Sequence, residues 1–198
     1  MIKFPIEFIK SKKAILNAKI FKNEFLLMPA TLFYSIEINL EEFQIDKQKI
    51  TTSFYLDFIR LNIYNLKELE NRSFEFPINP SPSFIDGSIY LFDVHNPIDV
   101  SQIEFSTIKN NSIDATLYFD IDFEYENSGY CKLNNCELKL EIQFGALNID
   151  TEIMTAENFD EKTANELVSK FSDLNNYEIP QIIENQVIFK IEIRVSHN

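Results

Sequence analysis

The stretch from Ile113 to Tyr125 alternates between apolar and polar side chains with a period of two residues. Its odd positions are apolar or aromatic: Ile113, Ala115, Leu117, Phe119, Ile121, Phe123 and Tyr125. Its even positions are polar or tyrosine: Asp114, Thr116, Tyr118, Asp120, Asp122 and Glu124. A period of two is typical of a β-strand with one buried face and one face in water. We therefore predict a strand over residues 113–126 that carries carboxylates along its solvent face.

Similar alternation recurs along the chain and predicts a protein built mainly from strands. The predicted strands are residues 2–8, 31–40, 49–64, 74–76, 88–94, 101–108, 113–126, 136–149 and 186–195. The apolar positions of 49–64 change parity near Phe58, which indicates a β-bulge or a bend. Residues 113–126 and 136–149 are separated by a short loop, so we expect them to form a long hairpin. Residues 14–28 fit neither a helical nor a strand period.

One amphipathic helix is predicted over residues 156–174, with Thr155 as its N-cap. Its apolar stripe consists of Phe159, Leu167, Val168, Phe171 and Leu174. Eight or nine strands and one helix in the C-terminal half predict an all-β fold, an antiparallel β-sandwich. Hydrophobic residues make up 45% of the 198 residues, which is enough for a single domain over residues 1–198. The Pro-rich loop 77–86 is the one place where this domain could subdivide.

The composition excludes several classes of function. Three glycines and the lack of any G-x-G-x-x-G or G-x-x-x-x-G-K-[ST] motif argue against a nucleotide-binding enzyme. A net charge of −13 repels nucleic acid and anionic lipid and attracts basic proteins. Two cysteines, Cys131 and Cys136, and two histidines supply too few ligands for a zinc site. We expect no cofactor, no nucleic-acid or membrane partner and, since no secretory signal or membrane-spanning run is evident, a cytoplasmic location.

The acidic side of strand 113–126 is the first candidate site. Carboxylates at every second residue repel one another unless cations oppose them, and tyrosine beside carboxylate is common in protein-binding patches. The candidate protein-binding residues are Tyr118, Asp120, Asp122, Glu124, Glu126, Tyr130, Glu137 and Glu141. The alternatives are a merely solvated face, which is ordinary in antiparallel sheets, or a calcium site, for which a flat strand presents its oxygens poorly. The lysine-rich residues 1–28 could cover this face or guard an edge strand.

A second candidate site comprises Asp93, His95 and Asp99. Asp–His pairs perform acid–base work and bind metals, and His95 is the only histidine away from the chain terminus. Two or three residues are fewer than a complete active site needs. The alternative is a turn, since Asn96-Pro97 is a strong turn signal. Catalysis by His95 with Asp93 or Asp99, as a hydrolase or metal-dependent enzyme, is the alternative function.

Residues 87–126, which contain GSIYLFDVHNPIDV from Gly87 to Val100 and then Ile103 to Phe105, resemble small bacterial proteins. Some of these proteins accompany secreted toxins as cognate immunity proteins. The resemblance implies inhibition of a toxin domain by surface complementarity, without catalysis. We therefore expect a non-enzymatic, acidic binding protein with a basic toxin as its partner. A third hypothesis is a structural or assembly module whose exposed strand edges pair with other subunits.

Overall fold

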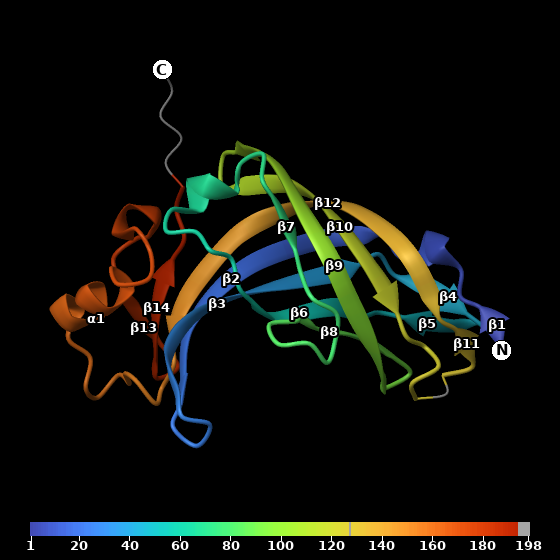
Figure 1. The fold of residues 1–198 in the computed structure, drawn as a ribbon, viewed down its shortest axis with the longest axis horizontal. Helices are drawn as coiled ribbons and strands as arrows, with labels where there is room; N and C mark the ends of the chain where they lie inside the picture. The colour runs from blue at the N-terminus through green and yellow to red at the C-terminus, as the bar shows by residue number, and fades with distance from the viewer. Residues whose placement is uncertain (127, 194–198) are drawn as a thin grey trace.

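The computed structural model describes residues 1–126 and 128–193, and most of its regular structure is β-strand (Figure 1). Seven strands form a closed barrel. They are β2 (Ser11–Asn23), β3 (Met28–Leu40), β6 (Ser53–Ile59), β8 (Asp86–Leu91), β9 (Val94–Lys109), β10 (Ser112–Ile121) and β12 (Leu133–Ile149). Each of these strands pairs antiparallel with the next one along the chain.

The parallel pairing of β12 with β2 closes the barrel. Strand direction alternates along a meander, so the first and the seventh strand run the same way and can pair only in parallel. At this junction the register shifts between Phe144 and Leu147. Gly145 permits the close approach there, because a Cβ at this position would lie 2.2 Å from Asn17 Oδ1. The Ala146 amide donates a hydrogen bond of 3.0 Å to the same oxygen.

Shorter elements extend or cover the barrel. They are β1 (Ile2–Lys3), β4 (Phe43–Ile45), β5 (Gln48–Ile50), β7 (Ser73–Glu75), β11 (Tyr130–Cys131), β13 (Gln181–Ile183), β14 (Gln186–Lys190) and α1 (Glu161–Val168), with 3-10 turns at Ile6–Phe8, Leu66–Leu69 and Leu174–Asn176. β7 pairs with β9, and β14 extends the sheet from β12 towards β13. Figure 1 shows β1, β4, β5 and β11 at one end of the barrel, and α1, β13, β14 and the β2–β3 turn at the other.

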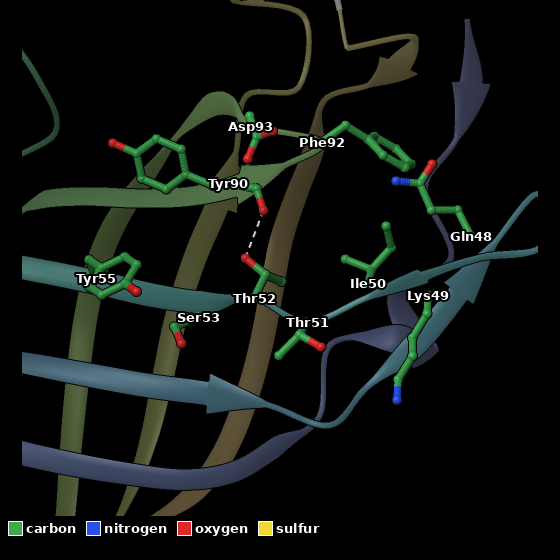
Figure 2. A pocket seen from close by; sticks show the side chains of 10 residues that line it. All are labelled: Gln48, Lys49, Ile50, Thr51, Thr52, Ser53, Tyr55, Tyr90, Phe92 and Asp93. Atoms are coloured by element: carbon green, nitrogen blue, oxygen red, sulfur yellow. Dashed lines mark hydrogen bonds between the residues drawn. The ribbon is translucent and has the colours of Figure 1, made fainter.

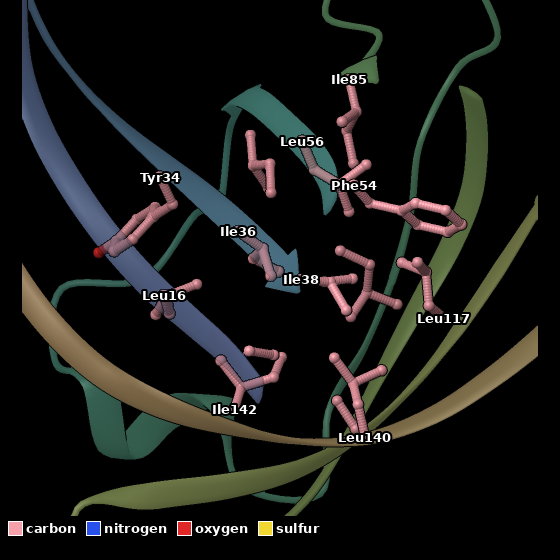
Figure 3. Close-up of a cluster of buried hydrophobic side chains, with 14 of the residues drawn as sticks. Leu16, Tyr34, Ile36, Ile38, Phe54, Leu56, Ile85, Leu117, Leu140 and Ile142 are labelled. Atoms are coloured by element: carbon pink, nitrogen blue, oxygen red, sulfur yellow. The ribbon is translucent and has the colours of Figure 1, made fainter. Parts of the chain in front are cut away.

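The barrel interior is filled by side chains. Inward-facing residues such as Leu16, Ile38 and Leu140 are buried in one cluster (Figure 3). Phe54 of β6 and Phe119 of β10 are not on neighbouring strands, yet their ring centroids lie 5.4 Å apart. These aromatic side chains therefore meet across the interior, and the barrel is a packed core and not a pore.

An aromatic cluster closes the end of the barrel where the chain begins. Phe4 is fully buried and stacks on Phe123 at 4.7 Å, and Phe8 stacks on Phe43 at 5.1 Å. Tyr130 packs edge-on against Phe4 at 5.2 Å. The predicted strand 2–8 is therefore wrong beyond Lys3, because Phe4 turns into the barrel end and a 3-10 turn follows.

The all-β prediction is confirmed, but the predicted sandwich is wrong. A sandwich has two separate sheets that face each other, whereas β12 here pairs with both β10 and β2 and joins all seven strands into a closed ring. The predicted hairpin is confirmed, since Ile113 pairs with Ile142 and Phe119 with Cys136.

Several predicted boundaries are corrected by the structure. The strand predicted over 113–126 ends at Ile121, and a turn follows. The strand predicted over 49–64 is divided between β5 and β6, and the bulge predicted near Phe58 is confirmed by a register shift opposite Tyr34 and Ile36. The uncertain region 14–28 forms β2, the following turn and the start of β3. The final strand predicted over 186–195 ends at Lys190, and its residues 194–195 lie outside the described part of the chain.

The predicted helix 156–174 is too long. α1 spans only Glu161–Val168, and its N-cap is Asp160, whose carboxylate accepts a hydrogen bond of 2.8 Å from the Thr163 amide, instead of Thr155. Phe171 and Leu174 still pack against the core, but Phe171 does so from a turn after the helix and Leu174 from the 3-10 turn that follows. Within the described residues, no helix is both long and apolar enough to cross a membrane.

The contact between Phe54 and Phe119 predicts a large loss of stability for Phe119→Ala. Removal of this buried ring leaves a cavity in the barrel and is expected to lower the free energy of unfolding by about 3–5 kcal/mol. Urea denaturation followed by circular dichroism measures the change. Phe92→Ala is the control, because Phe92 is 41% exposed in the β8–β9 turn. Equal losses in the two variants would contradict the assignment of Phe119 to the core.

Candidate functional site

The outer wall of β9, β10 and β12 carries three of the six predicted carboxylates, Asp120, Glu137 and Glu141. We call this surface the acidic face. Its carboxylates are Asp99 and Glu104 on β9, Asp114 and Asp120 on β10, and Glu137 and Glu141 on β12. Their inward-facing neighbours on each strand are buried, so the alternation places the carboxylates outside.

Like charges face each other directly across the strands of this surface. Asp120 is the register partner of Asp99, and Asp114 is the register partner of Glu141. Carboxylates in this position repel one another. Among the described residues, Lys109 forms an ion pair with Asp114 and Lys139 with Glu137, and Lys132 lies near enough to Asp99 to offset part of its charge.

The centre of the acidic face is ordered by hydrogen bonds. The Tyr118 hydroxyl donates to Glu104 Oε2 at 3.1 Å, and this bond raises the pKa of Tyr118. Gln102 Nε2 donates to the other Glu104 oxygen at 2.9 Å. Asp120 accepts a bond of 2.7 Å from the Asn135 amide. These carboxylates are therefore held in place by the barrel and do not sample many orientations.

The carboxylates after residue 121 lie on a turn and not on the predicted strand face. Asp122 Oδ1 accepts hydrogen bonds of 3.0 Å from the amides of Glu124 and Tyr125, so its first role is to stabilise the turn. Glu124 and Glu126 are exposed on this turn. Tyr125 is 66% exposed, although the alternating pattern placed it on the buried side.

Tyr130 does not belong to the acidic face. It is half-buried in β11 and contacts Phe4 and Phe123, so it contributes to the cluster that closes the barrel end. Burial raises the pKa of its hydroxyl. The sequence placed it in an exposed hairpin loop because nothing local to residue 130 reveals the pairing of β11 with β1.

The N-terminal lysines do not cover the acidic face. β2 carries most of them and is an internal barrel strand between β3 and β12, so they do not guard a sheet edge. Lys19 pairs with Asp150 and Lys22 with Glu24, both away from this surface. Lys12 and Lys13 are exposed beside Lys139 and Glu141 at the border of the acidic face.

A groove of about 780 Å³ adjoins the acidic face at the start of β9. It brings together His95 and Asp99 of the second candidate site with Asp122 and Glu126 of the first. Asp86, Phe84 and Tyr125 also line it. The sequence did not predict this arrangement, because the contact of the 122–126 turn with β9 depends on a long-range hydrogen bond from the Asp122 amide to the Pro97 carbonyl.

Burial raises the pKa of the Asp99 carboxyl, and the nearby carboxylates of Asp120 and Asp122 act in the same direction. Lys132 acts in the opposite direction, as does a backbone hydrogen bond from Asn79. Asp99 is thus a half-buried acid in a groove with excess negative charge, which is a setting typical of functional sites.

Asp93 lies apart from His95 and Asp99. It sits in the β8–β9 turn and borders a different hollow, between that turn and β5 (Figure 2). The hydrogen bond of 2.7 Å from Thr52 Oγ1 to the Tyr90 carbonyl crosses this hollow. The His95 ring packs against Tyr90 at 5.4 Å, and among the described residues no hydrogen bond joins His95 to Asp93 or Asp99.

The described part of the chain contains no cluster of three or more His, Cys, Asp or Glu side chains positioned to hold a metal ion. Cys131 and Cys136 are both free thiols. Comparison of the chain with known protein families, curated proteins and solved structures finds no match.

The setting of Asp99 predicts a pH-dependent effect of Asp99→Asn. The pKa of Asp99 is higher in the folded protein than in the unfolded chain. The folded state is therefore favoured at pH values below the unfolded pKa, where Asp99 is protonated. This contribution to the free energy of unfolding is lost as the pH rises through the folded pKa. The asparagine side chain mimics the neutral carboxyl, so the variant should be more stable than the wild type at neutral pH, with no difference at acid pH. Urea denaturation at a series of pH values measures this. Asp93→Asn, in the exposed turn, is the control, and a gain that persists at acid pH would contradict the explanation.

Proposed function

We propose that the protein binds a basic protein partner through the acidic face and the adjoining groove. The observation that carries this proposal is the direct opposition of carboxylates, Asp120 with Asp99 and Asp114 with Glu141. Repulsion between Asp120 and Asp99 costs stability in the free protein, whereas Lys109 offsets the repulsion between Asp114 and Glu141. Lysine or arginine side chains of a partner would relieve that repulsion, so binding gains energy that the isolated protein lacks.

The arrangement of the acidic face supports binding of a folded partner over loose association with any polycation. Glu104 and Asp120 are held by hydrogen bonds from Tyr118 and Asn135, so less side-chain entropy is lost on binding. The exposed Tyr125 at the groove supplies apolar contact area beside the charges. The net charge of −13 would also steer a basic partner towards the molecule and raise the association rate at low salt.

We propose that the basic partner is a bacterial toxin and that binding inhibits it. This step rests on the resemblance of residues 87–126 to toxin-immunity proteins, and the segment contributes β8, β9 and β10, which form much of the acidic face and its groove. Inhibition by occlusion needs no catalytic group in the inhibitor.

The groove favours hydrolysis of a small substrate as a second candidate function. Its volume of about 780 Å³ is that of a small-molecule site. His95 could transfer a proton there and Asp99, whose pKa is raised, could act as an acid.

Removal of charge from the acidic face is expected to weaken partner binding. The test variant is Glu126→Gln, Glu137→Gln and Glu141→Gln combined, which keeps side-chain shape and one acceptor oxygen per residue. The immobilised wild-type chain is used to capture proteins from extracts of its source cells, and a captured basic protein is then purified. We expect the variant to bind this protein roughly tenfold or more weakly in a titration, because several close charge pairs are lost.

The matched control is Glu41→Gln, Glu157→Gln and Glu184→Gln, which removes the same charge from exposed positions elsewhere. It should bind within about twofold of the wild type. Co-expression of the chain should also suppress toxicity of the captured protein. The proposal would be contradicted if both variants weakened partner binding equally, or if only acidic proteins were captured.

Hydrolysis is tested separately with 4-nitrophenyl acetate and bis-4-nitrophenyl phosphate. If the protein acts only by binding, the wild type and His95→Asn release nitrophenol at the same rate as buffer. Release by the wild type that is abolished in both His95→Asn and Asp99→Asn would favour the second candidate function over the first.

A further inference from the structure

The hollow between β5 and the β8–β9 turn is a second concave surface, and it shares no lining residue with the acidic face or its groove (Figure 2). Its volume of about 610 Å³ is within the range of small-molecule sites. The lining combines aromatic rings with hydroxyl, amide and carboxylate groups. Neither function proposed above uses this hollow.

Three aromatic side chains of the hollow are open to solvent. Tyr55 is 41% exposed, Tyr90 is 45% exposed and Phe92 is 41% exposed. Tyr55 and Tyr90 lie on the neighbouring strands β6 and β8, with ring centroids 6.4 Å apart. Figure 2 shows Phe92 on the other side of the hollow, where Gln48 also lies. The hollow therefore has an aromatic platform on each side and polar groups between the platforms.

The barrel holds Tyr90 and Phe92 in place. Thr52 Oγ1 donates a hydrogen bond of 2.7 Å to the Tyr90 carbonyl, and the His95 ring packs against Tyr90 at 5.4 Å. Phe92 and Asp93 form the two-residue turn of the hairpin, and both have a left-handed backbone, with φ of 52° and 65°. Asparagine and glycine suit such a turn better than phenylalanine does. The stability of the turn does not explain Phe92, and its ring is left open to a ligand.

The polar groups between the platforms are free to bind a ligand. Among the described residues, the side chains of Gln48, Thr51 and Asp93 form no hydrogen bond or ion pair. On the acidic face, by contrast, Tyr118 and Glu104 satisfy each other. An amide and a hydroxyl can both donate and accept, and a carboxylate accepts. This set of groups suits a ligand that carries many hydroxyl groups.

The charges of the hollow exclude an anionic ligand. Lys49 is the one basic residue of the lining, and its Nζ lies 2.6 Å from Glu42 Oε2 outside the hollow. Asp93 is the one acidic residue of the lining. A phosphate or sulfate group would therefore meet a lysine that is already paired and a carboxylate that repels it. The charged neighbours add one further negative charge in sum, and they are Glu37 beside Tyr55 and Asp46 and Lys47 beside Gln48.

We propose that the hollow binds a neutral oligosaccharide. The platform of Tyr55 and Tyr90 would pack on the apolar face of one sugar ring and Phe92 on that of another, because aromatic rings supply large apolar contact areas. The amide, hydroxyl and carboxylate between the platforms would bind the sugar hydroxyls. An extended peptide fits less well, since β5 has only three residues and offers too short an edge for an added strand.

Isothermal titration calorimetry of the full chain tests this proposal with maltohexaose, cellohexaose and chitohexaose as neutral probes. We expect at least one of them to bind with a Kd of about 1 mM or tighter. Tyr90→Ala and Phe92→Ala should each weaken that binding roughly tenfold or more, with little change in melting temperature, because both rings lie outside the core. Tyr90→Phe keeps the platform and should bind within about twofold of the wild type.

The matched control is Phe25→Ala. Phe25 is 94% exposed, but it lies in the β2–β3 turn at the opposite end of the barrel (Figure 1). This variant should bind the oligosaccharide like the wild type. The combined variant of Glu126, Glu137 and Glu141 should also bind it unchanged, so failure of this proposal is distinguishable from failure of the proposed function.

Four outcomes would overturn the proposal. The first is that none of the three probes binds at about 10 mM. The second is binding that survives both Tyr90→Ala and Phe92→Ala, and the third is binding that Phe25→Ala weakens equally. The fourth is that a sulfated heparin hexasaccharide or hexalysine occupies the hollow in place of the neutral probes, with binding that is lost in Tyr90→Ala.

Discussion

The parallel pairing of β12 with β2 is the contact on which the rest of the structure depends. In a meander of seven strands the first and last strands run in the same direction, so the barrel cannot close with an antiparallel pair. Parallel pairing is slightly less stable per residue. The chain supports it with the bulge at Gly145 and with the hydrogen bond from the Ala146 amide to Asn17. Closure gives each of the seven strands two neighbours and turns one face of each strand into the core.

A closed barrel with a filled interior leaves binding to its outer wall and its ends. Phe54 and Phe119 meet in the middle of the interior, and Phe4 and Phe123 close one end. The outer wall of β9, β10 and β12 is where closure brings carboxylates from three separate strands into register. Each of those strands alone has an ordinary polar face, and only the pairing turns them into a surface with opposed like charges.

The period-two pattern was sufficient to predict the pairing of 113–121 with the strand that contains Ile142, because both have one apolar and one polar face. It could not separate a barrel from a sandwich, since both alternate in the same way and differ only in the β12–β2 contact. The pattern failed at residues 14–28 for a physical reason. Ile15 and Phe21 lie on the outer wall of β2 while Ala14 and Ala18 face inwards, so both faces look apolar. The groove escaped prediction because segments far apart in the sequence line it, and one of their contacts is the hydrogen bond from the Asp122 amide to the Pro97 carbonyl.

The proposed binding of a basic partner has a salt dependence that follows from the charges of the acidic face. Binding of a basic partner to the acidic face depends on attraction between exposed charges and weakens as salt shortens the Debye length, about 10 Å at 0.1 M.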